Sequence, residues 1–177
     1  MRKVIAFCGF EKSGKSYSAQ RLMMTRKFKH LAFADALRDV AFNIIGMNFA
    51  DGMKQYEELK KTDLINGLTF RNILENLGSG IRKYDKDFWV RAVIKLISNC
   101  PDNVCISDLR YPNEYLLLKD FCDKNEIEFK LVFCDYHSED YRDDNPHESA
   151  RFAKYLKELG YEDQQYVKEE DVLQYKG

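Results

Sequence analysis

A run of eight residues near the start of the chain has the composition and spacing of a phosphate-binding loop. The run reads Gly9-Phe10-Glu11-Lys12-Ser13-Gly14-Lys15-Ser16 and matches the pattern GxxxxGK[ST] in full. In such a loop the glycines let the backbone turn tightly, so that successive N–H groups converge on phosphate oxygens. Lys15 would bridge the β- and γ-phosphates of ATP, and the hydroxyl of Ser16 would supply one oxygen ligand to Mg²⁺. We therefore assign to nucleotide binding the residues Gly9, Lys12, Ser13, Gly14, Lys15 and Ser16.

A Mg²⁺–nucleotide site also needs a carboxylate near the end of a neighbouring strand, and Asp108 meets that requirement. It directly follows the apolar run 104–107. The alternative role for this residue is to cap a helix or turn before Pro112. The next residue is Leu109 rather than a second acid, which disfavours ATP hydrolysis as the main activity. The [NT]KxD motif of guanine-specific switches does not occur in the sequence.

Transfer of a phosphoryl group to an anionic acceptor requires guanidinium groups that offset the charge repulsion. Arg110 lies just beyond Asp108, at the carboxyl end of a strand, where ligands of open parallel sheets bind. Arg71 opens a helix, where the dipole does not favour a cation, and Arg82 follows Gly78-Ser79-Gly80, a backbone able to approach a ligand closely. Any one of these could equally be a solvated surface arginine, so the set counts for more than its members. The candidates are Arg38, Arg71, Arg82, Arg91, Arg110 and Arg142, and we assign Arg110 and Arg142 to catalysis together with Lys15.

Three further side chains each allow two interpretations. Asp35 could contact the sugar or base of an acceptor, or serve only as a helix N-cap. Trp89 could belong to the core or provide a platform on which a base stacks. His147, which follows Asn145-Pro146, could cap the start of a helix or touch nucleotide.

The composition excludes several other classes of protein. The chain has 177 residues, of which 45% are hydrophobic, a size that fits one domain with its own core. Its 28 Lys and Arg against 29 Asp and Glu disfavour a nonspecific nucleic-acid binder. No apolar run approaches the ~18 residues of a membrane span, and no signal peptide precedes the first strand pattern. The five cysteines contain no CxxC pair, which indicates reduced thiols and a cytoplasmic protein (in the host cytoplasm, if the chain is viral).

Short apolar runs alternate with longer helical patterns, which predicts an α/β fold with a parallel sheet. We expect strands at 3–8, 30–33, 104–107 and 129–133. We expect helices at about 15–27, from Asp35 to Gly46, from Thr69 to a stop at Gly78, and at about 86–99, 115–121 and 146–159. Residues 48–67 are charged and only partly helical in pattern. We expect a single domain over 1–177, with a helical acceptor-binding region at about 48–100 and a lid at about 135–147.

In order along the chain, these residues resemble the phage-type deoxynucleoside monophosphate kinases, within the superfamily of P-loop nucleoside and nucleotide kinases. The matching pieces are the loop 9–16, Phe33-Ala34-Asp35-Ala36-Leu37-Arg38, the run 70–78, Asp87-Phe88-Trp89-Val90, Ser107-Asp108-Leu109-Arg110 with Asn113-Glu114, and Asn145-Pro146-His147-Glu148. They extend from residue 4 to about 150. Apart from the phosphate loop each piece is short, so their order is more specific than any one of them.

The resemblance implies a three-layer α/β/α P-loop fold and a Mg²⁺-dependent transfer of the ATP γ-phosphate to a deoxynucleoside monophosphate. It implies Ser16 and Asp108 as metal ligands, and a homodimer is the family expectation. It implies neither nucleic acid nor membrane as a partner. The residues that it implies for the acceptor are Asp35, Arg38, Arg71, Arg82, Trp89, Arg110, Glu114 and His147. Some relatives have Asp after the loop lysine, where this chain has Ser16. The chain is also short for the family, and residues 48–67 resemble a trimmed acceptor-binding insertion.

Two other functions stay open at this point. The acceptor could be another small phosphate ester, of the dephospho-coenzyme A or phosphomevalonate type, because the phosphate loop does not contact the acceptor. The chain could also be a non-catalytic module whose partner recognises the ATP-bound state. The arginine set favours a kinase over such a module.

Overall fold

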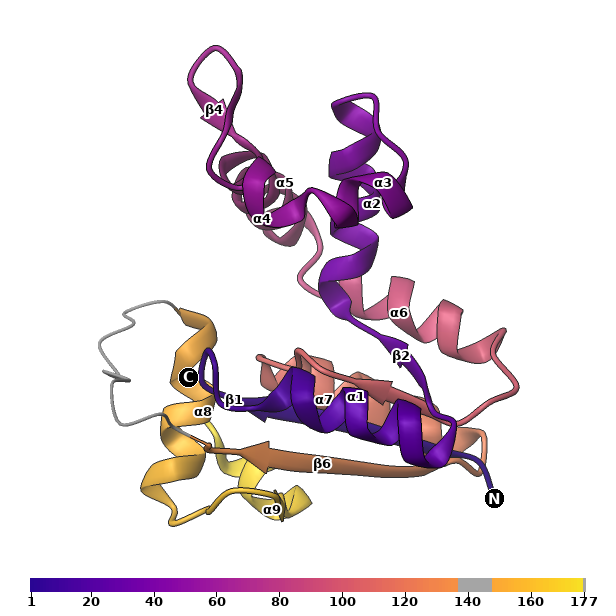
Figure 1. The fold of residues 1–177 in the computed structure, drawn as a ribbon. Coiled ribbons are helices and arrows are strands. Elements are labelled where there is room, and N and C mark those ends of the chain that lie inside the picture. Colours follow the sequence, from indigo (N-terminus) through magenta and orange to yellow (C-terminus); the bar gives the residue numbers. More distant parts are fainter. Residues whose placement is uncertain (137–147, 177) are drawn as a thin grey trace. The chain divides into compact units, whose positions relative to one another are not determined.

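A computed structural model describes residues 1–136 and 148–176 of the chain (Figure 1). The chain forms two compact units, Met1–Ala32 with Val93–Gly177, and Phe33–Ala92. The elements of the first unit are β1 (Lys3–Gly9), α1 (Lys15–Arg26), β2 (Lys29–Leu31), β5 (Val104–Ile106), α7 (Pro112–Lys124), β6 (Glu128–Cys134), α8 (Glu148–Glu158), β7 (Gln165–Tyr166) and α9 (Glu169–Gln174). Helix α6 (Phe88–Ser98) is shared, and its part from Val93 onward belongs to this unit.

The first unit is built on a five-stranded sheet with the order β2-β5-β1-β6-β7. β1 pairs in parallel with both of its neighbours, so that Ala6 lies between Ile106 and Leu131. β2 is also parallel, whereas the short β7 runs antiparallel to β6. The prediction of an α/β fold is confirmed. The parallel pairing holds for four strands, and the antiparallel edge strand is a difference from the expectation.

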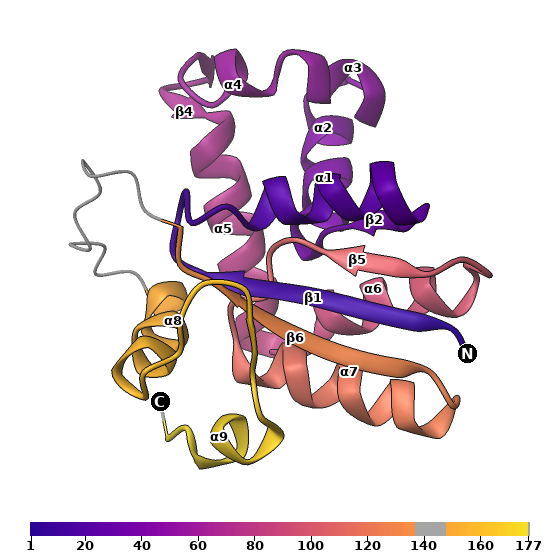
Figure 2. The same cartoon turned by 60° about the horizontal axis from the view of Figure 1, so that its bottom comes forward.

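Helices cover both faces of this sheet (Figure 2), which explains why β1 is apolar without alternation. Val4 and Ala6 are fully buried, and α7 and α8 pack on the face opposite to α1. On the α1 face, Phe7, Ala19 and Val132 belong to one buried cluster. The five cysteines are buried as free thiols.

The second unit is mostly helical. Its elements are α2 (Phe33–Ile44), α3 (Phe49–Lys54), α4 (Tyr56–Leu59), β3 (Asp63–Ile65), β4 (Leu68–Thr69), α5 (Phe70–Tyr84) and the start of α6. Its core centres on Phe42 and Phe70, whose rings stack with centroids 4.6 Å apart. A Cβ at Gly52 would lie 2.4 Å from the Phe42 ring, so only glycine lets α3 pack this closely.

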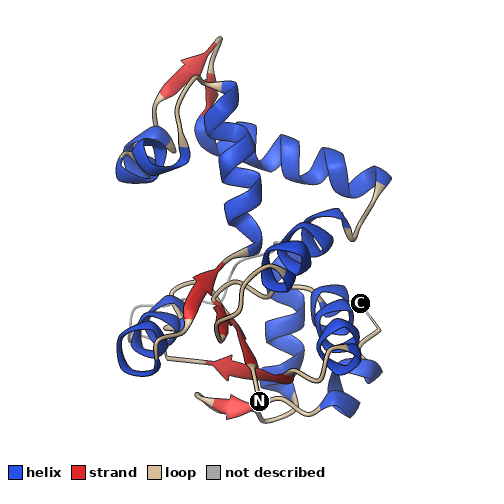
Figure 3. Cartoon of the chain, turned by 90° about the vertical axis from the view of Figure 1, so that its right-hand side faces the viewer, coloured by secondary structure: helices blue, strands red, loops and turns tan. Residues whose placement is uncertain are grey.

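Several element boundaries in the second unit differ from the sequence expectation. Phe33, expected in a strand, begins α2, and Asp35 lies inside the first helical turn rather than capping it. Helix α5 continues through Gly78 to Tyr84. Residues 48–67 contain two short helices and also β3, which pairs with β4 in a hairpin (Figure 3). The Asn66-Gly67 turn of this hairpin has positive φ angles of 46° and 84°.

The predicted lid at about 135–147 falls mainly on residues 137–147, which lie outside the described residues. The helical acceptor-binding region at about 48–100 overlaps the second unit, and its role stays a prediction. Among the described residues, none of the helices combines the length and apolar content that a membrane crossing requires.

Candidate active site

The phosphate loop connects the end of β1 directly to the start of α1, as its mechanism requires. Gly9 ends β1 with φ 139°, and a Cβ there would lie 2.1 Å from the carbonyl oxygen of Cys134 on β6. Gly14 is the N-cap of α1 with φ 85° and has no side chain over the helix end. Both positions therefore require glycine, and the Gly14 N-cap places no side-chain hydrogen bond on the start of α1, the helix end that favours an anion.

Inside the loop, Ser13 is fully buried and its backbone N–H donates to the carbonyl of Phe10 at 3.3 Å. Lys12 has a left-handed φ of 61° and an exposed side chain. The Ser13–Phe10 hydrogen bond closes the turn of the loop, with Ser13 on its inner side and Lys12 on its outer side.

The Lys15 ammonium group folds back onto its own loop. It donates to the carbonyl of Gly9 at 3.0 Å, to the carbonyl of Phe10, and to the Ser13 hydroxyl at 3.4 Å. Burial and, to a smaller extent, the positive charge of Arg110 together lower the pKa of Lys15 to about 8. To reach a phosphate, the side chain must exchange these carbonyl contacts for phosphate oxygens, which hold a cation more strongly.

Asp108 and Arg110 lie at the same end of the sheet as Lys15. The charges of both residues act on the pKa of Lys15, Arg110 lowering it and Asp108 raising it. Leu109, between them, is fully buried, and its N–H donates to the carbonyl of Phe7 on β1 at 3.1 Å. The structure thus brings together Lys15, Asp108 and Arg110, which the sequence assigned to one site.

Glu114 fixes the turn that follows. Its carboxylate is 3% exposed and accepts hydrogen bonds from the N–H groups of Arg110 (2.7 Å) and Tyr111 (3.0 Å). This is the capping box of α7. The geometry gives Glu114 a structural role in holding Arg110, and the acceptor contact that the resemblance implies stays a prediction.

The oxygen donors near the loop fit Mg²⁺. Magnesium is usually bound by one or two protein oxygens, with phosphates and waters completing its octahedron. Ser16, next to Lys15, and Asp108 supply such a pair. Over residues 1–136 and 148–176 there is no cluster of three or more His, Cys, Asp or Glu side chains that could hold a metal ion by themselves. A hydroxyl and a carboxylate are oxygen donors of the kind that Mg²⁺ prefers.

The other acceptor candidates among the described residues belong to the second unit. Arg38 forms an ion pair with Asp35 at 2.7 Å, and its guanidinium lies 4.9 Å from the centre of the Tyr56 ring. Trp89 is only 3% exposed. Arg82 lies on α5 within the helix, because Gly78-Ser79-Gly80 is helical rather than an open turn.

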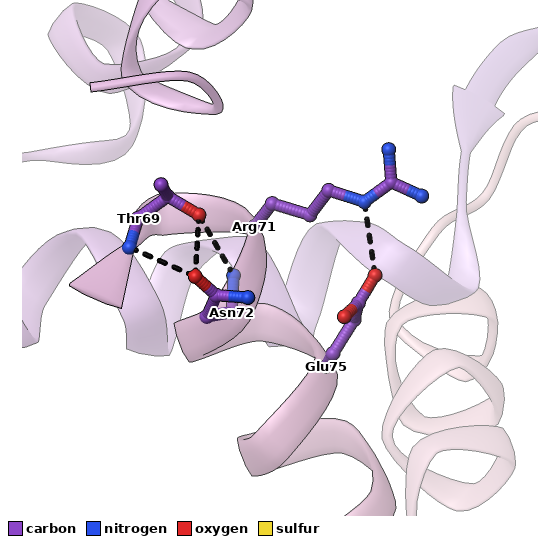
Figure 4. Close-up of polar contacts among 4 residues, drawn as sticks. All are labelled: Thr69, Arg71, Asn72 and Glu75. Carbon is purple, nitrogen blue, oxygen red and sulfur yellow. Dashed lines mark hydrogen bonds and ion pairs between the residues drawn. The ribbon is translucent and has the colours of Figure 1, made fainter. Parts of the chain in front are cut away.

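Arg71 lies in the first turn of α5, where the helix is already capped by other residues (Figure 4). The Thr69 hydroxyl accepts from the N–H of Asn72, and the Asn72 side chain accepts from the N–H of Thr69. Arg71 is 72% exposed and pairs with Glu75 at 2.9 Å. The Thr69–Asn72 capping box therefore forms without the Arg71 side chain. Arg91 pairs with Asp85, and Arg142 and His147 lie outside the described residues.

A groove of about 1110 Å³ begins at the phosphate loop and runs along α1. The groove forms because α1 packs over β1, β2 and β5 and leaves β6 and β7 partly uncovered on the same face of the sheet. At the loop end, Tyr136 lies 3.4 Å from where a Gly14 Cβ would be, and the Gln164 amide donates to the Ser18 hydroxyl at 3.0 Å. Its lining residues include Ile5, Phe7, Gly14, Tyr17, Ser18, Arg21, Leu22, Val132, Tyr136, Gln164 and Tyr166.

Sequence reasoning did not find Tyr17, Tyr136 or Gln164. Tyr136 comes two residues after β6, at the carboxyl edge where ligands bind, and that position could have indicated it. Gln164 carries no such signal, because its place beside α1 depends on β7 returning antiparallel to β6.

The comparisons with known proteins do not assign the chain to a family. No family model matches it, and no curated protein matches it. Among solved structures, it is similar to a cysteine-to-alanine mutant of the APS kinase from Mycobacterium tuberculosis, with 18% identity, a TM-score of 0.37, and coverage of 89% of this chain and 96% of that chain. A similarity of that size supports no functional argument, so the function is argued from the site itself.

Proposed function

We propose that this protein is a Mg²⁺-dependent kinase that transfers the γ-phosphate of ATP to a deoxynucleoside monophosphate. The observation that carries the proposal is the β1–loop–α1 cradle with Lys15 within electrostatic range of both Asp108 and Arg110. The cradle binds a triphosphate, the acid faces its metal ion, and the arginine provides positive charge for a second anion.

The donor half of the site can be assigned to this chain's own residues. The amides at the start of α1 and the ammonium of Lys15 would neutralise charge that builds up on the transferred phosphoryl group. Ser16 and Asp108 would hold Mg²⁺, which would supply positive charge to the phosphate groups. The amides of the α1 start and Ser16 are positioned by the loop, and Asp108 by the end of β5, so the main rearrangement needed for binding is that of Lys15.

The groove supports a nucleotide rather than a simple polyphosphate. Tyr17 and Tyr136 are 70% and 67% exposed beside the loop, where an aromatic base could stack on them. The Gln164 side chain offers an amide to the edge of such a base. We therefore place the adenine of ATP at the loop end of the groove.

The acceptor half is the more specific part of the proposal. Arg110 is in electrostatic range of Lys15 and would hold the acceptor phosphate. The acceptor contacts that the sequence resemblance implies for Asp35, Arg38, Arg71, Arg82 and Trp89, all within residues 33–92, stay predictions. Arg142 and His147 complete the set that the sequence resemblance implies. The acceptor phosphate is already ionised, so the transfer does not require a strong general base.

A panel of acceptors tests this proposal. Purified protein with Mg²⁺ and ATP would be given each deoxynucleoside monophosphate, and in parallel dephospho-coenzyme A and phosphomevalonate, while ADP release is followed. Release that depends on one or more deoxynucleotides supports the proposal. Release only with another ester would indicate the other kinase type, and ATP binding with no acceptor-dependent release would indicate a non-catalytic module.

A further inference from the structure

The carboxyl end of β5 is attached on both sides at the point where Asp108 leaves the sheet. On the β2 side, the ring Nε2 of His30 lies 2.7 Å from the hydroxyl of Ser107. On the β1 side, the N–H of Leu109 donates to the carbonyl of Phe7 at 3.1 Å. Asp108 is the single residue between these two attachments.

The strand register explains why a side chain takes part on the β2 side. β2 ends at Leu31, which pairs with Ile106, so the backbone ladder stops one residue before Ser107. His30 pairs with Cys105, and Ser107 lies two residues further on the same face of the sheet. The imidazole therefore reaches along the sheet and replaces the ladder contact that β2 no longer supplies.

Because Ser107 is buried, its hydroxyl depends on the His30 ring for a hydrogen-bond partner. Its side chain is 8% exposed, and a buried hydroxyl without a partner is costly. Without the ring, Ser107 would have to rotate or admit water, and the backbone that carries Asp108 would lose its attachment to β2. The next attachment along the chain is the Glu114 carboxylate on the N–H groups of Arg110 and Tyr111.

We propose that His30 is a positioning residue that orients Asp108 through Ser107 and so sets how strongly Mg²⁺ supports nucleotide binding. The inference rests on the proposed function, because it takes Asp108 to be a carboxylate of a Mg²⁺–nucleotide site. His30 itself touches neither the nucleotide nor the metal. Groups that orient a metal ligand typically contribute about 10- to 100-fold to metal affinity or activity.

Isothermal titration calorimetry tests this with two forms of the ligand, ATP in EDTA and ATP with saturating Mg²⁺. The readout is the ratio of the two affinities, which separates the metal-dependent part of binding from the contribution of the phosphate loop. For His30→Ala we expect the Mg²⁺-dependent gain to fall about tenfold, with the affinity in EDTA unchanged. For His30→Gln, whose amide can still bond the Ser107 hydroxyl, we expect most of the gain to return.

Ser107→Ala provides the second variant, because it removes the same contact and keeps the ring. We expect it to lower the gain as His30→Ala does, and the double variant to lose no more than either single one. Should His30→Ala fail to fold, Ser107→Ala and His30→Gln still give the result.

Two outcomes would overturn the inference, and they are distinguishable. If the wild-type protein binds Mg²⁺–ATP more tightly than ATP and the folded variants do so equally well, the positioning role is wrong while the proposed function stands. If the wild-type protein binds neither form, the proposed function fails and the inference fails with it.

Discussion

Lys15 is the residue whose surroundings bear most directly on function. It is held by carbonyl groups of its own loop and faces the like charge of Arg110, and burial already disfavours its charged form. A bound triphosphate reverses this balance, because its negative charge favours the ammonium form. Under the proposed function, the pKa of Lys15 rises from about 8 when ATP binds.

This gives a pH dependence whose direction is fixed by linkage. Above pH 8 the free protein has lost the Lys15 proton and the ATP complex retains it, so ATP binding takes up a proton and weakens as pH rises. We expect the affinity, measured by calorimetry, to be nearly constant from pH 7 to 7.5 and to fall by up to about fivefold between pH 8 and 9. Lys15→Arg is the matched control, because arginine stays charged over this pH range. The affinity of that variant for ATP should therefore not change with pH. An equal fall in that variant would assign the effect to another group.

Gly9 is required for a geometric reason, which leads to a second prediction. Its φ of 139° and the 2.1 Å approach of a Cβ to the Cys134 carbonyl oxygen leave no room for a side chain. We expect Gly9→Ala to lower the free energy of unfolding by about 2 kcal/mol or more in urea denaturation. Gly160 also has a positive φ (86°), but a Cβ there meets nothing within 4 Å, so Gly160→Ala should lower the free energy of unfolding less. Equal losses in the two variants would contradict this account of the loop.

At the scale of elements, the sequence was most informative where a local pattern and its tertiary setting agree. The apolar run of β1, the loop motif and the start of α1 are predictable because strand burial, glycine placement and helix start coincide within 16 residues. The placement of Asp108 and Arg110 followed from the rule that ligands lie at the carboxyl ends of parallel strands. The groove and the His30 contact were not predictable, because both depend on which strands are neighbours.

Helix α5 shows the opposite case, in which a local signal was misleading. Gly78 predicted a helix end, yet the helix continues to Tyr84 because the capping box at Thr69 starts it firmly and its apolar face packs in the core of the second unit. Gly78 is used for close packing, since a Cβ there would lie 3.2 Å from a methyl group of Leu37. The glycine marks a contact between helices rather than an end.

The two glycines of α5 should therefore respond differently to alanine. A Cβ at Gly80 meets nothing within 4 Å, so Gly80→Ala should stabilise the protein by about 1 kcal/mol through helix propensity alone. Gly78→Ala gains the same propensity but must push Leu37 aside, and we expect no net stabilisation. Thermal and urea unfolding of both variants check this. A larger gain at Gly78 than at Gly80 would show that the packing argument is wrong.

At the scale of the whole molecule, the residues that we propose for the site divide between two compact units. The phosphate loop, Asp108 and Arg110 belong to the sheet unit, together with the groove along α1. Arg38, Arg71 and Arg82 belong to the helical unit of residues 33–92. Donor binding can thus be changed by substitutions in the first unit without touching the arginines of the second.

The groove offers a direct test of that division. Removing the Tyr136 ring should weaken ATP binding roughly fivefold, as expected for the loss of about 1 kcal/mol of stacking, and should leave the KM for the acceptor unchanged. Tyr84→Ala is the control, because Tyr84 is exposed and lies in the other unit. Steady-state kinetics with ATP and acceptor varied separately give both constants. An unaltered KM for ATP in the Tyr136→Ala variant would show that the adenine does not bind at this end of the groove.

The central claim is that residues 9–16 hold the triphosphate whose γ-phosphate is passed to a deoxynucleoside monophosphate. The most direct measurement follows radiolabel from γ-labelled ATP into product, for the wild-type protein and for Lys15→Met, with circular dichroism to verify that both are folded. We predict labelled deoxynucleoside diphosphate from the wild-type protein and none above background from the variant. Labelled product formed equally by both proteins, or by neither with any of the deoxynucleotides, would contradict the claim.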